Sequence, residues 1–255
     1  MILKNNLSIF DIHIHVGIYE NRWDFSAFYI KELCRHLPIS HFICAPVSWQ
    51  QSLENYTIRT FEDLPCDLSE KSLFWLWISP VRKKSIDLLQ HENIPKGYIG
   101  VKLHPYADHY DISAELLDPV FSSCEKWNVP LAIHTGNDGT DPLSICSAMP
   151  EDYSQPVILF HSRPINEAIR AAKAHKSIYL ESSFCEPEEL NWAFNEIDKK
   201  RILFGSDYPL NLIYYPGLNI IDLYRQNVND LLDITEQSDC SEDFFFRNAK
   251  RIFKL

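Results

Sequence analysis

The stretch SIFDIHIH, residues 8–15, indicates how this chain folds. It is a short run of mostly β-branched and aromatic residues in which two histidines are separated by a single residue. Because alternate side chains of a strand point to the same face, we expect Asp11, His13 and His15 to share one face. Two imidazoles side by side suit a metal ion, and they equally suit a core in which each histidine has a hydrogen-bond partner.

Seven further runs of this kind follow, and helical patterns separate most of them. The runs are nearly continuous in hydrophobic residues, which is typical of parallel strands that helices cover. They are HFICAPVS (41–48), LFWLWIS (73–79), YIGVKLH (98–104), VPLAIHT (129–135), VILFHS (157–162), SIYLESS (177–183) and RILFGSD (201–207). Helices are predicted over 24–37, 112–127, 163–176 and 186–198, with a short one over 142–149.

Eight strands that alternate with helices predict an α/β fold, specifically a (β/α)8 TIM barrel, with residues 1–255 as one domain. A doubly wound open sheet is the structural alternative. That fold is disfavoured because no glycine-rich phosphate loop follows the first predicted strand.

Composition narrows the classes of function. The 255 residues are 45% hydrophobic and 23% charged, with a net charge of −11, which argues against nucleic-acid binding. No apolar run approaches the ~20 residues of a membrane span, and the N-terminus does not resemble a signal peptide. The seven cysteines are scattered without a CxxC motif, which favours reduced thiols and a cytoplasmic location. The sequence does not distinguish a monomer from a homo-oligomer.

Polar residues stand at or near the ends of five predicted strands. In a (β/α)8 barrel, catalytic groups lie at the carboxyl ends of the strands. Buried polar groups are costly without partners, so their repeated occurrence on apolar segments predicts a functional site. Each also has a structural explanation: a hydrogen-bonded core histidine, a lysine that reaches solvent, or an aspartate that caps a turn. The residues are His13, His15, Lys102, His104, His134, His161 and Asp207.

A divalent metal explains this set best. His13 and His15 would give two nitrogen ligands, His134 a third, and Asp207 an oxygen. Catalytic zinc sites typically use three protein ligands and leave a position for water, and some become five-coordinate. Such an ion lowers the pKa of water toward ~7. Asp207 would then serve as ligand and proton acceptor, and His161 would orient the water or protonate a leaving group. Zinc suits these ligands, as do manganese, iron, nickel and cobalt.

The ordered motifs resemble those of the amidohydrolase superfamily, over nearly the whole chain. More narrowly, the chain is similar to the amidohydrolase-related branch that includes aminocarboxymuconate-semialdehyde decarboxylase. The segments that carry the resemblance are DIHIHVG (11–17), GYIGVKLHP (97–105), LAIHTG (131–136), VILFHSR (157–163), RILFGSDYP (201–209) and RNAKRIF (247–253). The last of these resembles the usual closing helix.

The resemblance implies roles for several residues. In members with one metal, the ligands match His13, His15, His134 and Asp207, and the residue that matches His161 assists proton transfer. Some members with two metals carry a carbamylated lysine, for which Lys102 is the candidate. The alternative is that Lys102 binds a substrate carboxylate as a cation.

We therefore expect a metal-dependent hydrolase that acts on a small polar substrate: an amide, a lactone or an ester. The substrate is expected to be anionic if cationic side chains such as Lys102 contact it. The first alternative is non-oxidative decarboxylation of a small carboxylic acid at the same residues. The second is a barrel that binds metal or ligand without turnover. Candidates for substrate contact, chosen by position, are His104, Arg163, Tyr208, Arg22 and Trp23.

Overall fold

The computed structural model describes residues 7–19, 23–25, 27–62, 68, 70–137 and 139–255. Its strands form one nine-stranded sheet in the order β2-β1-β3-β4-β5-β6-β7-β8-β9. All neighbours pair in parallel except β2 (Trp23–Phe25), which pairs antiparallel with β1. The parallel strands are β1 (Ile9–Tyr19), β3 (Ile39–Pro46), β4 (Ser72–Trp77), β5 (Tyr98–Leu103), β6 (Leu131–His134), β7 (Val157–Phe160), β8 (Ile178–Glu181) and β9 (Ile202–Leu203).

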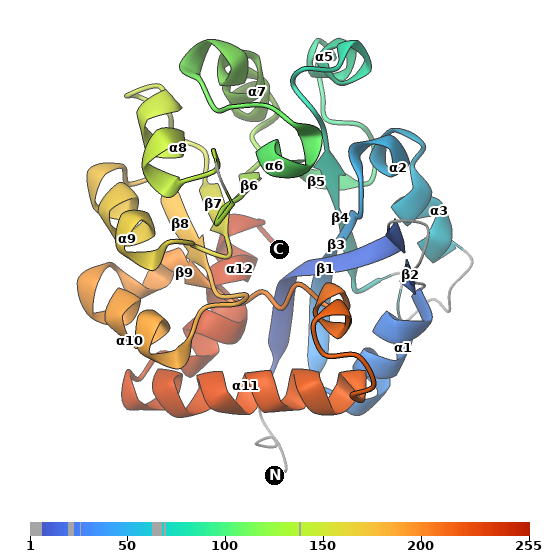
Figure 1. Cartoon of the computed structure of the whole chain (residues 1–255), viewed down its shortest axis with the longest axis vertical. Coiled ribbons are helices and arrows are strands. Elements are labelled where there is room, and N and C mark those ends of the chain that lie inside the picture. The colour runs from blue at the N-terminus through green and yellow to red at the C-terminus, as the bar shows by residue number, and fades with distance from the viewer. Residues whose placement is uncertain (1–6, 20–22, 26, 63–67, 69, 138) are drawn as a thin grey trace.

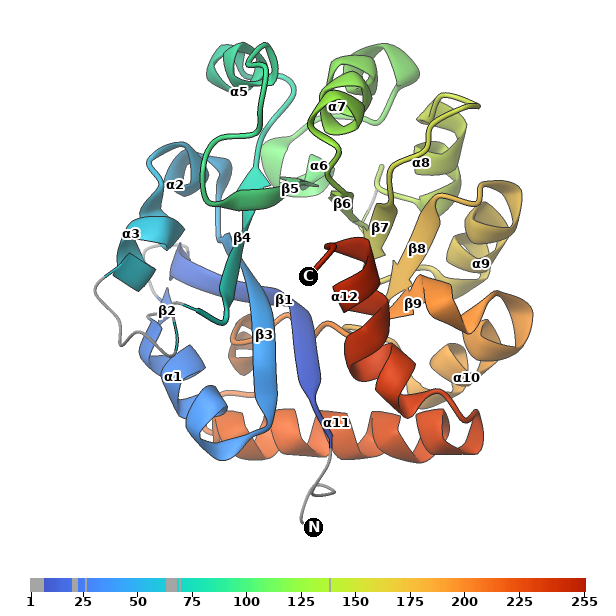
Figure 2. The same ribbon diagram turned by 180° about the vertical axis from the view of Figure 1, so that it is seen from behind.

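Backbone hydrogen bonds join the two ends of this sheet. The segment after β9 runs beside β1, where the N–H of Asp207 donates to the carbonyl of His13 at 2.8 Å. The N–H of His15 donates to the carbonyl of Tyr208 at 2.7 Å. The strands therefore curl around a common centre with helices outside them, as Figures 1 and 2 show. This arrangement confirms the predicted (β/α)8 barrel and rules out the open sheet.

Helices cover the outside of the barrel and follow the predicted pattern. In α7 (Ala114–Trp127), the Ser113 hydroxyl accepts the N–H of Leu116, and the helix continues through Pro119. The other helices are α1 (Ala27–His36), α2 (Trp49–Leu53), α3 (Tyr56–Glu62), α5 (Lys83–Leu89), α6 (Pro105–Asp108), α8 (Pro142–Ala148), α9 (Ile165–Ala174), α10 (Pro187–Glu196), α11 (Ile220–Gln237) and α12 (Asn248–Ile252). Three short helical turns are η1 (Lys199–Arg201), η2 (Leu210–Ile213) and η3 (Asp243–Arg247). None of the helices in the described parts of the chain is long and apolar enough to span a bilayer.

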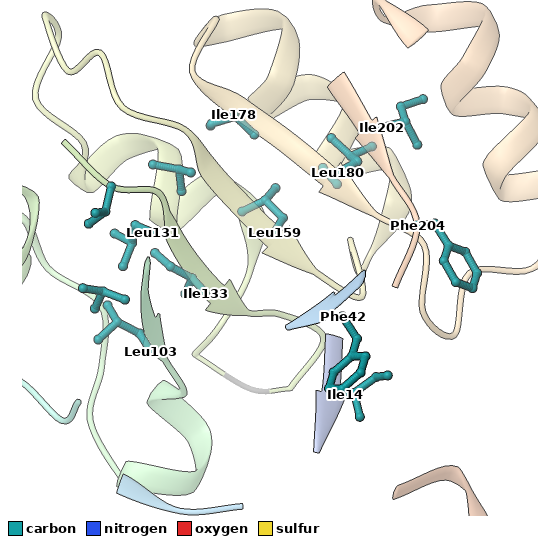
Figure 3. Packing of buried hydrophobic residues seen from close by; sticks show 14 of the residues in the cluster. Ile14, Phe42, Leu103, Leu131, Ile133, Leu159, Ile178, Leu180, Ile202 and Phe204 are labelled. Atoms are coloured by element: carbon teal, nitrogen blue, oxygen red, sulfur yellow. The ribbon is translucent and has the colours of Figure 1, made fainter. Parts of the chain in front are cut away.

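The hydrophobic core has two parts. The larger part lies between strands and helices and includes Ile14, Phe42 and Leu159 (Figure 3). The smaller part packs inside the barrel, around Trp75 and Phe160. The ring of Phe253, just after α12, packs on that of Trp75 at 5.5 Å, so the closing helix covers the amino ends of the strands (Figure 2). The opposite end, where the strands finish, is left for polar side chains.

An irregularity in β1 overturns one expectation. The pairing of β1 with β3 shifts register between Asp11 and Ile14, which is how a β-bulge breaks the alternation of side chains. Ile12 and His13 therefore both face the interior, while Asp11 faces α11 and accepts a hydrogen bond from the Tyr224 hydroxyl at 2.9 Å. The prediction that Asp11 shares a face with the two histidines is wrong.

Candidate metal centre and active site

A pocket of about 660 Å³ opens at the carboxyl ends of the strands. Its walls are largely aromatic and polar, with Trp77, Tyr106 and Tyr214 among the lining residues. The polar residues that the sequence singled out at the strand ends all line it: His13, His15, Lys102, His104, His134, His161 and Asp207. The strand geometry therefore brings residues from the beginning, middle and end of the chain to one place.

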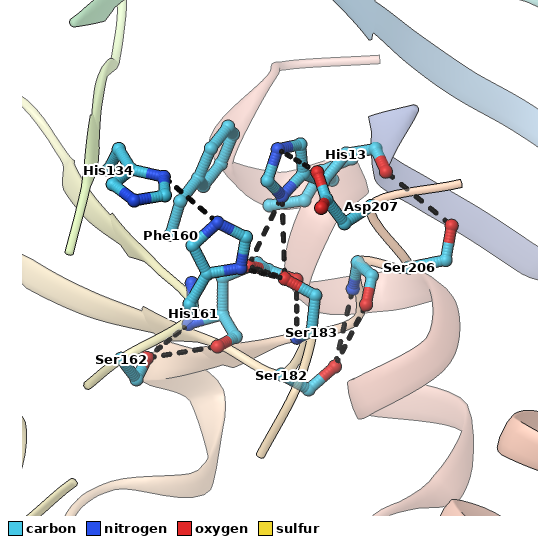
Figure 4. Close-up of polar contacts among 12 residues, drawn as sticks. His13, His134, Phe160, His161, Ser162, Ser182, Ser183, Ser206 and Asp207 are labelled. Atoms are coloured by element: carbon cyan, nitrogen blue, oxygen red, sulfur yellow. Dashed lines mark hydrogen bonds and ion pairs between the residues drawn. The ribbon is translucent and has the colours of Figure 1, made fainter. Parts of the chain in front are cut away.

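Three potential ligand atoms meet on the first-strand side of the pocket. Oδ1 of Asp207 lies 3.0 Å from Nε2 of His13 and 3.2 Å from Nε2 of His15. The two imidazole nitrogens lie 3.1 Å apart. All three side chains are buried, and Figure 4 shows Asp207 facing His13.

Hydrogen bonds on the far side of each ring indicate where its proton lies. Nδ1 of His15 is 3.0 Å from the carbonyl of Pro46, which only accepts, so the proton of the neutral ring is on Nδ1. Nδ1 of His13 faces a carboxylate oxygen of Glu181 at 3.4 Å. Burial lowers the pKa of both histidines, which favours neutral rings with unprotonated Nε2 atoms.

His134 and His161 form a second pair beside the first. Nδ1 of His134 lies 3.0 Å from Nε2 of His161, as Figure 4 shows. Nε2 of His134 is 2.6 Å from the side-chain oxygen of Asn137, and Nδ1 of His161 is 2.7 Å from the Ser183 hydroxyl. If the outer nitrogens carry the protons, the two inner nitrogens face each other with lone pairs. Burial lowers the pKa of His134 to about 4.

This donor set fits a divalent cation. Unprotonated nitrogens about 3 Å apart next to a carboxylate are stabilised by a positive charge placed among them. Neutral imidazoles with their outer N–H groups bound to oxygen are the usual arrangement of metal-binding histidines. The three atoms of His13, His15 and Asp207 lie within 4.8 Å of one another, as a shared ion requires. His134 is outside that group, so its role as a ligand stays a prediction.

Lys102 occupies the inner end of the pocket and does not reach solvent. Its Nζ lies 3.0 Å from Nε2 of His15 and 3.4 Å from Nε2 of His13. The ammonium also lies 4.9 Å from the centre of the Trp77 ring and 5.2 Å from that of Phe160. Burial lowers the pKa of Lys102 to about 7, so near neutral pH this buried amine exists in both its protonated and its neutral form.

Glu181, at the end of β8, is part of the site and was not singled out in the sequence. It is fully buried and contacts both His13 and the backbone of His161. Its atoms form a second possible ligand group with those of His13 and His161. The Ser183 hydroxyl already lies within 3.5 Å of all three, which leaves no room for an ion there. The sequence pattern that could have indicated Glu181 is the carboxylate at the end of a predicted strand, in the segment LESS (180–183).

The remaining residues, which the sequence predicts to contact substrate, differ in how they lie relative to the pocket. His104 lines the pocket and stacks on His134 with ring centres 3.7 Å apart. Tyr208 is buried against Tyr224 on the outer side and does not line the pocket, because the segment after β9 directs it toward α11. The guanidinium of Arg163 lies 5.3 Å from the Phe184 ring centre and does not line the pocket, but, besides burial, its charge helps to lower the pKa of His134 and His161. Arg22 and the side chain of Trp23 are outside the described residues.

Comparisons with known proteins agree with this geometry. The family model described as Amidohydrolase, Amidohydro_2, matches residues 73–255. Among solved structures, 2,6-dihydroxybenzoate decarboxylase from Rhizobium is similar with a TM-score of 0.70 and 15% identity, over 97% of this chain and 98% of that chain. Amidohydrolase 2 from Bifidobacterium longum subsp. infantis gives 0.66 and 13%, over 97% and 99%.

A third similar structure is described as a probable 2-pyrone-4,6-dicarboxylic acid hydrolase from Acinetobacter baumannii with citric acid bound. It has a TM-score of 0.65 and 13% identity, over 98% of this chain and 100% of that chain. At these identities the likeness to solved structures concerns the fold. No curated protein sequence matches the chain.

Proposed function

Since this chain belongs to the amidohydrolase family of the Amidohydro_2 model, we propose that it is a metal-dependent hydrolase of a small polar substrate: an amide, a lactone or an ester. The observation that carries the proposal is the meeting of His13, His15 and Asp207 at the carboxyl ends of the strands. Hydrolase and decarboxylase structures are both among those similar to the chain, so these likenesses do not distinguish the two reactions. We also propose that residues 1–255 form one domain.

We propose that His13, His15, His134 and Asp207 hold one divalent ion. Zinc is our first choice because three imidazoles and a carboxylate suit it, and manganese, iron, nickel and cobalt suit the same ligands. When bound, such an ion polarises a carbonyl group and lowers the pKa of water toward ~7. The pocket volume of about 660 Å³ agrees with a small-molecule substrate.

The side chains around the ion would move protons and hold the substrate. His161 presents Nε2 to the pocket next to His134, which places a neutral base where a proton must be taken up. Asp207 keeps a carboxylate oxygen for the same purpose. In its protonated form, the buried Lys102 would favour an anionic substrate or an anionic oxygen formed during the reaction.

A decarboxylase acting on a small carboxylic acid is the second candidate. The observation in its favour is the Lys102 ammonium, which lies among aromatic rings where an aromatic or unsaturated acid would place its carboxylate. Both reactions would use the same residues. Measuring carbon dioxide release against base uptake, over a panel of carboxylic acids, lactones, amides and esters, distinguishes them.

Elemental analysis and turnover of two histidine variants test the metal proposal. We expect about one equivalent of a divalent metal in protein purified without chelator. In His13→Ala we expect both the bound metal and the turnover to be lost. His36→Ala is the matched control, because the His36 side chain is 52% exposed on α1 and its Nε2 lies 3.7 Å from Oε2 of Glu32, remote in sequence from every proposed ligand. A His13→Ala protein with full metal content and full activity would refute the assignment.

A further inference from the structure

Glu181 binds two neighbouring elements at once. One carboxylate oxygen, Oε2, accepts the backbone N–H of His161 at 2.9 Å and the hydroxyl of Ser183 at 2.7 Å. The other oxygen, Oε1, accepts the backbone N–H of Ser183 at 2.7 Å. Oε2 also lies 3.4 Å from Nδ1 of His13. A carboxylate with this many donors on it is an anchor rather than a mobile group.

With Glu181 ionised, the Ser183 hydroxyl donates its one hydrogen to the carboxylate. The hydroxyl oxygen lies 2.7 Å from Nδ1 of His161, so in that contact the hydroxyl must accept. Nδ1 of His161 therefore carries a proton, and Nε2 of the neutral ring does not. Figure 4 shows Ser183 below the His161 ring and His134 on the opposite side.

We propose that Glu181 and Ser183 are positioning residues that hold His161 in the Nδ1–H form with its unprotonated Nε2 facing the pocket. This inference rests on the proposed function, in which His161 takes up a proton. Without the pair, the ring is free to exchange its proton to Nε2, where it can no longer act as a base. A histidine that depends on a second hydrogen bond for its tautomer is a common feature of catalytic sites.

The surrounding backbone is built to admit this pair. A Cβ on Gly205 would lie 2.2 Å from Oε1 and 2.7 Å from Cδ of Glu181, so only glycine leaves space for the carboxylate. His161 has a φ of +69°, which non-glycine residues adopt at a cost in conformational energy. The hydrogen bond from its N–H to Glu181 offsets part of that cost. Residues of β8 and of the segments after β7 and β9 are thus arranged around the same carboxylate.

The test compares three serine variants. Ser183→Ala removes the acceptor, and Ser183→Thr keeps a hydroxyl. Ser182→Ala is the matched control, because among the described residues the Ser182 hydroxyl hydrogen-bonds to the backbone of Gly205 alone, at 3.4 Å from O and 3.3 Å from N. Glu181→Gln, nearly the same shape, is the second route if Ser183→Ala does not fold.

Two kinds of measurement are made on each folded variant. Long-range ¹H–¹⁵N spectra of the metal-free full-length protein report which nitrogen of His161 is protonated, without any need for a substrate. Steady-state kinetics with metal bound, across pH, report kcat, KM and the acidic limb of the profile on the best substrate of the panel.

We expect Ser183→Ala to move the His161 proton toward a mixture of Nδ1–H and Nε2–H. We also expect kcat to fall about 10- to 100-fold with KM changed less than about threefold. Ser183→Thr should restore most of both, and Ser182→Ala should match the unaltered protein. Glu181→Gln should resemble Ser183→Ala, because an amide group cannot accept all of the donors that the carboxylate accepts.

The inference is overturned if Ser183→Ala leaves the His161 tautomer unchanged, or if Ser182→Ala has an equal effect. Loss of thermal stability with an unaltered tautomer and unaltered kcat would mean a structural role only. If the unaltered protein turns over no substrate while the tautomer still shifts in Ser183→Ala, the positioning pair is established and the proposed function is the part that fails.

Discussion

The peptide N–H of Asp207 donates to the carbonyl of His13 at 2.8 Å, and Oδ1 of the same aspartate lies 3.0 Å from Nε2 of that histidine. One residue therefore joins the last strand segment to the first and places a carboxylate among the imidazoles. Asp207 has a φ of +59°, a conformation that aspartate tolerates better than most residues. Barrel closure depends on the backbone N–H of Asp207, whereas ligand placement depends on its carboxylate, so the site should be lost before the fold when only the carboxylate is changed.

Asp207→Asn tests that separation. The amide keeps the size and backbone of the aspartate, so we expect a small change in melting temperature. It loses the negative charge that a divalent ion needs, so metal affinity should fall at least tenfold and turnover at least a hundredfold. Isothermal titration with zinc and thermal unfolding of the metal-free protein measure the two effects. Equal loss of stability and of metal affinity would contradict the argument.

Gly205→Ala tests the space around Glu181. The new Cβ would lie 2.2 Å from Oε1 of the buried carboxylate, so the Glu181 side chain must shift from its contacts with His161 and Ser183. We expect a loss of about 1–3 kcal/mol in the free energy of unfolding, which is usual for overpacking. Urea titration measures it, and kcat should fall in parallel. An alanine variant as stable and active as the original would show that Glu181 has room to move.

Much of this site could be predicted from the sequence, for a definite physical reason. Runs such as VILFHS (157–162) are so apolar that exposure to water does not explain the histidine near their end. Parallel strands also bring their carboxyl ends together, so the polar residues there meet in one place. His13, His15, His161 and Asp207 were identified by that reasoning, and all of them line the pocket.

Other features depend on contacts that no local pattern specifies. The bulge in β1 reverses which side Asp11 faces, and a bulge leaves no mark in a simple alternation of residues. The role of Glu181 depends on Ser183 and on the backbone of His161, which lies on a different strand connection. Asn137 similarly matters only because His134 turns its outer nitrogen toward it.

The buried carboxyl of Asp11 predicts a pH dependence of stability. Burial is the main cause that raises the pKa of Asp11 from 3.8 to about 7, despite hydrogen bonds from Ser206 and Tyr224 that lower it. Between these two values the folded state binds more protons at this group than the unfolded state does. The stabilising effect is therefore complete below about pH 4 and is lost as the pH rises through about 7.

Asp11→Asn isolates this contribution, because the amide is neutral at every pH. We expect the free energy of unfolding of the original protein, relative to that of the variant, to decrease between pH 4.5 and pH 7.5. Chemical unfolding of both metal-free proteins at these values measures the difference, and other titrating groups largely cancel. A difference that stays constant, or that increases with pH, would show that Asp11 is ionised throughout.

Lys102→Met distinguishes a single ion with a cationic lysine from two ions bridged by a carbamylated one. The ammonium lies 3.0 Å from Nε2 of His15, so as a cation it must repel a metal held by that nitrogen. Methionine has a similar shape and suits the space between Trp77 and Phe160, without the charge. We expect metal affinity to rise about tenfold, equal to ~1.4 kcal/mol, with stoichiometry near one and weaker binding of anionic substrates. Titration of metal into both metal-free proteins, followed by elemental analysis, measures this. A variant that binds metal more weakly and loses a second equivalent would instead establish the lysine as a bridging ligand, in agreement with a carbamate detected by intact mass in the original protein.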